Sequence, residues 1–252
     1  MRCRYNSTAT MIEITNLSKN FGKMPVLRSV NLTFSKGECV ALIGPNGCGK
    51  TTLIKSILSM VIPSEGKIAV FGESITNNFA YRRHIGYMPQ IGRYPDNMTI
   101  RQVIDMVKDI RASTTKNRDI ATDESLIEDF HLAGMEDKRM RTLSGGTTQK
   151  VSATLAFLFK PDIIILDEPT AGLDPLSSEV LKDKILTEKQ NGKLTLITSH
   201  LLSELDDLVT SIVFMQDGAV RFHKSVDDLK NFTGEEKISK AIATILKNQS
   251  HE

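Results

Sequence analysis

A segment of eight residues, Gly44-Pro45-Asn46-Gly47-Cys48-Gly49-Lys50-Thr51, has residue types and spacing that suit phosphate binding. It fits the pattern G-x-x-x-x-G-K-[ST], follows the apolar segment 39–43, and precedes a helical pattern that starts near Leu53. Its glycines let backbone N–H groups converge on phosphate oxygens, and the helix N-terminus adds a favourable dipole. Lys50 suits a bridge between β and γ phosphates, and the Thr51 hydroxyl suits Mg²⁺. The segment predicts a nucleoside triphosphate site, and both flanking elements count against a chance glycine turn.

Two acidic residues, Asp167 and Glu168, directly follow the apolar segment Ile163 to Leu166. Because parallel sheets bind ligands at the carboxyl ends of their strands, we expect both carboxylates beside the phosphate-binding segment. Side chains alternate along a strand, so the two acids point in different directions. We assign Asp167 to Mg²⁺, through water, and Glu168 to the base that orients and deprotonates the attacking water. Solvated acids at a strand end are the alternative, and the apolar strand before them argues against it.

Two further polar residues follow apolar strand patterns and are expected at the same edge of the sheet. His200 comes after the pattern 194–197, where an imidazole can contact the γ-phosphate and the attacking water. Gln90 comes after the pattern 85–88 and can act as a γ-phosphate sensor. The residue types leave an alternative for each, because His200 alone is better explained as a bystander and Gln90 equally well as a loop amide.

The segment Thr142 to Lys150, with the sequence TLSGGTTQK, is typical of the start of a helix. Ser144 is a good N-cap residue, and Gly145 and Gly146 leave the helix N-terminus free of side-chain bulk. A helix from Gln149 to Phe159 with such an N-terminus attracts anions, because its first N–H groups and its dipole favour negative charge. The alternative is a capped helix without a ligand.

The elements that must position these residues are short apolar strands that alternate with helical patterns. Apolar residues recur at helical spacing from about residue 97 to 159, and helical patterns return near 176–190 and 201–208. This alternation predicts an α/β fold with a parallel sheet and helices on its faces. Asp217-Gly218 predicts a hairpin turn, and residues 238–246 predict a short amphipathic helix that packs on its own domain. The strand patterns cover residues 11–14, 39–43, 67–71, 85–88, 163–166, 194–197, 212–215 and 219–222.

The composition argues against several classes of protein. The chain has 252 residues, a formal net charge of +2 and a pI near 8.3, so it carries no strong field for nucleic acid or anionic membranes. No apolar run approaches the ~20 residues that span a bilayer. The three cysteines form no CxxC or Cys/His spacing, which argues against a disulfide framework or structural zinc and fits a reducing cytosol. The segment 1–10 lacks the apolar core of a secretory signal.

Six motifs, in order along the chain, resemble the ATP-binding subunits of ABC transporters: GPNGCGKT, YMPQ, LSGG, IIILDEPT, AGLD and ITSH. The resemblance covers about residues 11–222. It implies an α/β fold of the P-loop NTPase class and ABC ATPase type, with a mainly parallel core sheet, an N-terminal antiparallel β part and an inserted helical subdomain. The expected parts are a disordered N-terminal extension (1–10), the first part of the ATP-binding core (11–90), the helical subdomain with the signature motif (91–160), the second part of the core (161–223) and a C-terminal helical tail (224–252).

The resemblance also implies roles for the candidate residues that bind ATP within one chain. Phe21 is expected to stack on adenine, in place of the tyrosine common at that position. Gln90 and Asp167 complete the Mg²⁺ and water shell. Glu168 is the catalytic base, and His200 is the γ-phosphate switch. The phosphates and Mg²⁺ are bound by the loop residues Gly44, Pro45, Asn46, Gly47, Cys48, Gly49, Lys50, Thr51 and Thr52.

Other residues are implied to act across a dimer. Ser144, Gly145 and Gly146 are expected to bind the γ-phosphate held by a second copy of the chain, and Asp174 to communicate between the copies. The implied activity is ATP hydrolysis by a homodimer that closes around two ATP and Mg²⁺ and drives a separate integral membrane permease.

The permease is expected to dock on the helical subdomain, which places the chain in the cytoplasm, peripheral on the inner face of the cell membrane. No nucleic-acid partner is expected. The alternatives are a soluble ABC ATPase that acts on DNA or ribosomes and a non-hydrolysing, nucleotide-dependent dimerisation module.

Two segments resemble a narrower group. MPQIGRYPDNM and LSGGTTQKVSATLAFLF are similar to the ATPases associated with copper-site maturation of nitrous oxide reductase, and a generic drug, lipid or haem-type exporter is the alternative. Thr147 and Thr148 depart from the superfamily, which more often has Gln, Glu, Met or a basic residue after Ser-Gly-Gly. Neutral side chains bring no charge toward a phosphate, so we expect the ATP chemistry to be retained.

Overall fold

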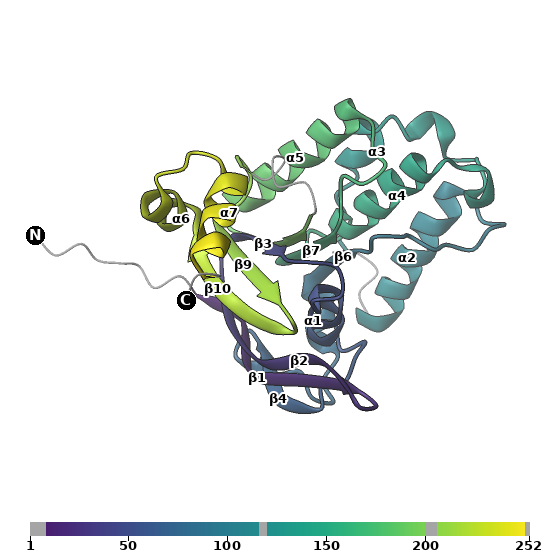
Figure 1. The fold of residues 1–252 in the computed structure, drawn as a ribbon. Coiled ribbons are helices and arrows are strands. Elements are labelled where there is room, and N and C mark those ends of the chain that lie inside the picture. The colour runs from purple at the N-terminus through teal and green to yellow at the C-terminus, as the bar shows by residue number, and fades with distance from the viewer. Residues whose placement is uncertain (1–8, 116–119, 200–205, 250–252) are drawn as a thin grey trace, which may run out of the picture. The chain divides into compact units, whose positions relative to one another are not determined.

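The computed structural model describes residues 9–115, 120–199 and 206–249 (Figure 1). The chain divides into two compact units, of which the first comprises residues 1–82 and 188–252 and the second residues 83–187. Most of the expected N-terminal extension, His200 and most of the helical pattern 201–208 lie outside the described residues.

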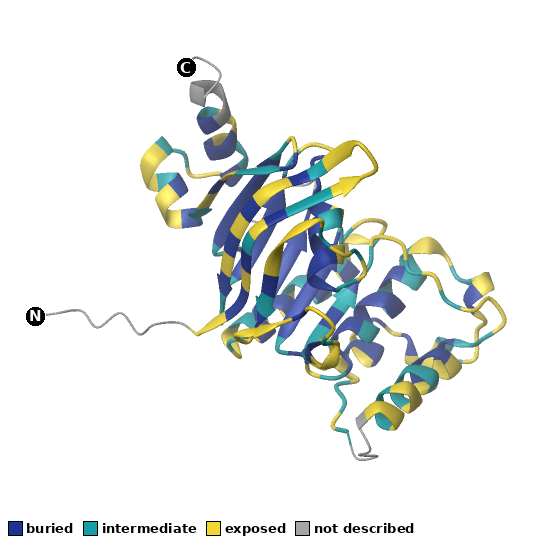
Figure 2. Cartoon of the chain, turned by 90° about the horizontal axis from the view of Figure 1, so that it is seen from below, coloured by how far each residue is buried: buried dark blue, intermediate teal, exposed yellow. Residues whose placement is uncertain are grey.

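The first unit contains an antiparallel sheet with the strand order β2-β1-β4-β5. Along β1, Ile12 and Ile14 are buried while Glu13 between them is exposed, which is the period of two expected for a sheet with one solvated face. The register shifts between Ile14 and Leu17, and this bulge returns Leu17 to the buried face. Figure 2 shows buried and exposed residues alternating along these strands. The sheet confirms the predicted N-terminal antiparallel part; its strands are β1 (Thr10–Phe21), β2 (Met24–Ser35), β4 (Glu65–Val70) and β5 (Glu73–Ser74).

A mainly parallel group of strands lies in the same unit, in the order β10-β9-β3-β8. The central strand β3 pairs in parallel with both β8 and β9, and all of its five residues are buried. Strand β10 returns antiparallel to β9 across the predicted turn at Asp217-Gly218. Helix α1 (Lys50–Ile57) follows β3 after the phosphate-binding segment. The strands are β3 (Cys39–Ile43), β8 (Leu194–Thr198), β9 (Ser211–Gln216) and β10 (Ala219–Ser225).

Two helices end the described chain in this unit, α6 (Val226–Thr233) and α7 (Ile238–Gln249). Both lie in the part expected to be a helical tail (224–252), although the apolar pattern marked only residues 238–246. Helix α6 starts where the Ser225 hydroxyl accepts the backbone N–H of Asp228. Helix α7 matches the predicted amphipathic helix, and its residues Ile238, Ile242 and Ile245 are buried against the rest of the chain, as expected for a helix that packs on its own domain.

The second unit contains the parallel pair β6 (Ile85–Met88) and β7 (Ile163–Asp167) and most of the helices. The region 97–159 was predicted to be helical throughout, but short 3-10 turns at Ala133–Met135 and Met140–Thr142 and loop segments interrupt it. Its helices are exposed on one side and buried on the other (Figure 2). No helix among the described residues is both long and apolar enough to cross a membrane. The helices are α2 (Ile100–Thr115), α3 (Ser125–Asp129), α4 (Gly145–Phe157) and α5 (Pro175–Gln190).

Candidate ATP site

The phosphate-binding segment of the first unit forms the predicted loop between β3 and α1. Gly44 has a φ of 152°, and a Cβ atom there would lie 2.1 Å from the backbone oxygen of Met215 on β9. Only glycine therefore lets the loop leave β3 this close to the neighbouring strand. The loop ends at Gly49, where α1 begins with backbone N–H groups that have no partner within the helix.

The side chain of Lys50 lies folded over this loop and is 8% exposed. Its ammonium group donates to the backbone oxygens of Gly44, at 2.6 Å, and Pro45, at 3.1 Å. The Cys48 sulfur is 3.9 Å from the same nitrogen and is buried. The loop thus gathers one cation and the first N–H groups of a helix, which is the donor set that phosphate oxygens need.

Phe21 ends β1 in the same unit and is half exposed, at 50%. The ammonium group of Lys19 lies 5.0 Å from the centroid of its ring. An exposed ring can stack on a purine, so the geometry of Phe21 is compatible with the predicted adenine contact.

The acidic pair belongs to the second unit. Asp167 is the last residue of β7 and is 5% exposed, while Glu168 follows in the loop with a φ of 54°. Burial raises the pKa of Tyr87 to about 12, and the nearby negative charge of Asp167 contributes to the shift. The side-chain amide of Gln149, which is buried on α4, donates to the backbone oxygen of Glu168 at 3.3 Å. Helix α4 therefore supports the backbone of the predicted base.

The signature segment forms the N-terminus of α4. The Ser144 hydroxyl accepts the backbone N–H of Thr147 at 3.2 Å, which confirms Ser144 as the N-cap. The predicted helix start at Gln149 is wrong, because this cap starts the helix at Gly145. The Thr148 hydroxyl donates back to the Ser144 carbonyl at 3.1 Å, so both threonines are used in the first turn.

The backbone of Gly172 lies against the start of α4. A Cβ atom on Gly146 would lie 2.7 Å from the backbone oxygen of Gly172, so a larger residue there would push the two segments apart. The motif therefore needs glycine at this position for packing within one chain, in addition to any ligand.

Asp174 contacts residues on both α4 and α5. Its carboxylate accepts the Ser177 backbone N–H at 2.9 Å and the Ser177 hydroxyl at 2.7 Å, at the start of α5. The Lys150 ammonium group on α4 lies 3.1 Å from the same carboxylate. The hydrogen bonds from Ser177 and then Lys150 hold the pKa of Asp174 well below its usual range. Asp174 thus joins α4 to α5.

Gln90 is exposed two residues after β6. The chain that follows it is attached to α4, because the Tyr94 phenol and the Ser152 hydroxyl are 2.7 Å apart. Burial raises the pKa of Tyr94, although the hydrogen bond with Ser152 opposes the shift. The segment after Gln90 is therefore held by the same helix as the backbone of Glu168.

Sequence reasoning missed the four residues that make these contacts on and around α4. Gln149, Lys150 and Ser152 are polar residues within three positions of each other, at the start of a helix that is otherwise rich in Ala, Leu, Val and Phe. That polarity in a buried helix is the one signal that marks them. Tyr94 carries no such signal. The second unit brings together Ser144, Gly146, Asp174 and the backbone of Glu168; Phe21 and the phosphate-binding loop belong to the first unit, and His200 is not among the described residues.

The comparisons with known proteins agree with this architecture. The family model described as "ABC transporter" matches residues 27–171. The Nod factor export ATP-binding protein I of Rhizobium meliloti (strain 1021) is 31% identical over 243 residues, which cover 96% of this chain and 71% of that protein. A solved ATP-binding subunit of an ABC transporter superposes with a TM-score of 0.83 at 28% identity, covering 94% of this chain and all of that one. The ATP-binding cassette MJ1267, in its ADP conformation, has a TM-score of 0.73 at 25% identity, with 94% and 99% covered.

The chain therefore belongs to the ABC transporter family. It has the P-loop ABC ATPase fold and is an ATP-binding, ATP-hydrolysing subunit of this family. The narrower resemblance to copper-maturation ATPases is not supported, because relatives such as the Rhizobium meliloti protein are named for Nod factor export.

Proposed function

We propose that this chain is the ATPase of an export system, which dimerises around two ATP molecules and drives a separate membrane subunit. The observation that carries the proposal is the N-terminus of α4, capped by Ser144 and free of side chains at Gly145 and Gly146. Such an N-terminus attracts an anion, and the exposed Ser144 and Gly145 leave it accessible to one held by a second copy.

The chemistry of the residues supports the following roles. The loop from Gly44 to Thr52, which includes Lys50, binds the phosphates. Phe21 stacks on the adenine. Glu168 accepts a proton from the attacking water, and His200 contacts the γ-phosphate.

The residues also fit a magnesium ion. Thr51 and Gln90 are exposed residues with oxygen-bearing side chains, and Asp167 supplies a carboxylate at a strand end. Mg²⁺ prefers oxygen ligands and keeps several waters, so we assign it to these three residues, partly through water. Bound there, the ion would neutralise the charge that develops on the transferred phosphate.

The membrane subunit is proposed to dock on the helical subdomain, residues 91–160, with the chain peripheral on the inner face of the cell membrane. A depression on α2 supports this placement, because Met98, Met106 and the 57% exposed Ile110 give it an apolar lining beside Asp105 and Asp109. An exposed apolar surface of this kind favours a protein partner.

Purification of the chain from its native membranes tests the function. We expect a hydrophobic integral membrane protein to copurify, with ATPase activity that depends on the complex. Copurification of nucleic acid or ribosomes without a membrane protein would instead support the soluble class. Copper in the copurified material would revive the copper-maturation hypothesis, which rests on two sequence segments alone.

A further inference from the structure

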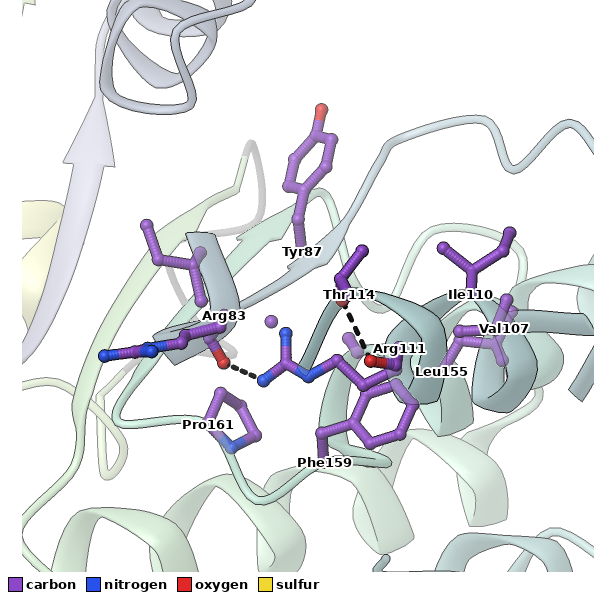
Figure 3. Close-up of a pocket in the computed structure, with 12 residues that line it drawn as sticks. Arg83, Tyr87, Val107, Ile110, Arg111, Thr114, Leu155, Phe159 and Pro161 are labelled. Atoms are coloured by element: carbon purple, nitrogen blue, oxygen red, sulfur yellow. Dashed lines mark hydrogen bonds between the residues drawn. The ribbon is translucent and has the colours of Figure 1, made fainter. Parts of the chain in front are cut away.

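Polar groups of a folded chain usually pair with one another. In the pocket shown in Figure 3, the Arg83 carbonyl accepts a hydrogen bond from the Arg111 guanidinium, and the Arg111 carbonyl accepts one from the Thr114 hydroxyl. The phosphate-binding loop of the first unit differs at the peptide bond between Asn46 and Gly47. Neither the Asn46 side chain nor the Gly47 backbone N–H has a hydrogen-bond partner among the described residues.

These two residues form the exposed middle of a tight turn. The Cys48 backbone N–H donates to the Pro45 carbonyl at 3.2 Å, and Gly47 between them has a φ of 78°. Asn46 and Gly47 are both exposed, and a Cβ atom at Gly47 would meet no atom within 4 Å. The Gly47 nitrogen is therefore unobstructed, next to a side-chain amide that is also open to solvent.

The other Asn-Gly pair of the sequence lies in a confined place. Asn191 and Gly192 follow α5, and the Gly192 backbone N–H donates to the Lys189 carbonyl at 2.9 Å. A Cβ atom at Gly192 would lie 2.9 Å from the Cε atom of Lys36. The chain thus contains a matched internal control, in which the same two residue types are held by a hydrogen bond.

We propose that Asn46-Gly47 is a site of spontaneous deamidation and that bound ATP protects it. The Gly47 nitrogen attacks Cγ of the Asn46 amide and loses its proton, ammonia leaves, and a cyclic succinimide forms. Water then opens the ring at either carbonyl, which gives aspartate or isoaspartate. The net reaction consumes water, releases ammonia and leaves a carboxylate in place of the amide. Glycine favours the first step, because no side chain hinders the attacking nitrogen and its backbone rotates freely.

The isoaspartate product changes the backbone of the loop as well as its charge. The chain then runs through the former side-chain carbonyl, so an extra carbon precedes Gly47 and displaces the N–H groups that face a phosphate. ATP affinity should therefore fall. Bound phosphates occupy the Gly47 N–H in turn, so nucleotide should slow the reaction. This inference rests on the proposed assignment of the loop to the ATP phosphates.

Peptide mapping of protein incubated without nucleotide in mildly alkaline buffer tests the chemistry. We expect isoaspartate to form at Asn46 at least about tenfold faster than at Asn191, whose glycine N–H is already bonded. Saturating Mg²⁺ and AMP-PNP, an ATP analogue that is not hydrolysed, should slow the reaction at Asn46 at least about tenfold and leave Asn191 unchanged.

Equilibrium dialysis with ATP tests the consequence. Binding should fall in proportion to isoaspartate at Asn46, and an isoaspartyl methyltransferase with S-adenosylmethionine, which returns isoaspartate to the succinimide, should restore part of it. Asn191→Gln should lose binding as fast as the unmodified protein. Asn46→Gln, whose longer side chain cyclises far more slowly, should keep the binding with which it starts.

Several results would overturn the proposal. Equal rates at Asn46 and Asn191, or modification of Asn46 only after unfolding in urea, would show that the turn is not reactive. Full ATP binding by protein modified at Asn46 would remove the functional consequence. Asn46→Asp brings the charge without the extra carbon and should weaken ATP binding less than the modification does; an equal loss would refute the role of the backbone.

One outcome separates this inference from the proposed function. If Asn46 is modified and AMP-PNP does not slow the reaction in protein that binds AMP-PNP, the loop does not hold the phosphates. That result would overturn the phosphate assignment, and the protection that rests on it, while the reaction at Asn46 itself is observed.

Discussion

The ammonium group of Lys150 lies 3.1 Å from a carboxylate oxygen of Asp174, and this ion pair joins the helix of the signature segment to the start of α5. The same helix bonds the backbone of Glu168 through Gln149 and the segment after Gln90 through Ser152. Three segments with proposed roles in hydrolysis or dimerisation are therefore attached to α4 by side chains from its residues 149–152.

Lys150→Met should loosen the Asp174 segment without touching the phosphate-binding loop. Exposed ion pairs contribute up to about 1 kcal/mol, so we expect ATP-driven dimerisation to weaken by up to about fivefold. ATP binding by the monomer should not change. Sedimentation at graded ATP concentrations measures the first quantity and equilibrium dialysis at low protein concentration the second.

Two further variants make the Lys150 experiment specific. Lys150→Arg should restore dimerisation, because it keeps the charge. Lys182→Met breaks an ion pair with Glu179 on the exposed side of α5 and should have no effect. Equal dimerisation by Lys150→Met and the unmodified protein would show that the ion pair has no part in assembly.

Glu168→Gln should keep ATP binding and lose turnover. The amide has nearly the shape of the carboxylate but cannot accept the proton of the attacking water, so hydrolysis should fall by at least about 10²-fold. With hydrolysis blocked, ATP stays bound and we expect a stable dimer in light scattering. A monomer at saturating ATP, with unchanged turnover, would remove Glu168 from the role of base.

Ser144→Arg should separate ATP binding from dimer-dependent hydrolysis. The large cation replaces the N-cap and occupies the space at the end of α4, so a phosphate from a second copy cannot approach. Monomer binding of ATP should be nearly unchanged and cooperative turnover abolished. Ser144→Ala is the matched control, because it removes the cap, at about 1 kcal/mol of stability, without filling the space. Cooperative turnover retained by Ser144→Arg would refute the role across the dimer.

Alkylation of Cys48 should inhibit hydrolysis, and ATP should protect. Cys48 lies in the phosphate-binding loop beside Lys50, whereas burial raises the pKa of Cys39 to about 12 and keeps that thiol protonated and unreactive near neutral pH. In a Cys3→Ser background, N-ethylmaleimide should inactivate the Cys39→Ser variant and spare the Cys48→Ser variant. Activity of the Cys39→Ser variant that survives the reagent would contradict this.

Prediction from the sequence worked best for features that depend on residues close together in the chain. The phosphate-binding loop, the Ser144 cap, the Asp217-Gly218 turn and the fully apolar strands follow from spacing and residue type within a few positions. The start of α4 was placed too late because the apolar pattern begins at Val151, whereas the cap lies further upstream. Helix α6 falls in the expected helical tail (224–252), but its own bounds could not be placed, since it buries Val226 and Leu229 alone, too few residues for a periodic pattern.

Contacts between distant segments were beyond sequence reasoning. The pairs Tyr94 with Ser152 and Gln149 with Glu168 join residues 58 and 19 positions apart, and neither spacing carries a signal. The close approach of Gly146 to Gly172 is of the same kind. The sequence showed that Gly146 leaves the helix end bare, and the structure adds that neighbouring backbone requires it.

The backbone conformation of Glu168 lowers the stability of the fold, while its side chain is the proposed catalytic base. Its φ of 54° lies in a region that costs a residue with a Cβ atom about 1 kcal/mol, and glycine there would avoid the cost. Glu168→Gly should therefore melt at a higher temperature than the unmodified protein while hydrolysing no ATP. Selection for thermal resistance alone would favour loss of the proposed base, so we expect the carboxylate at this position to persist only while turnover is under selection.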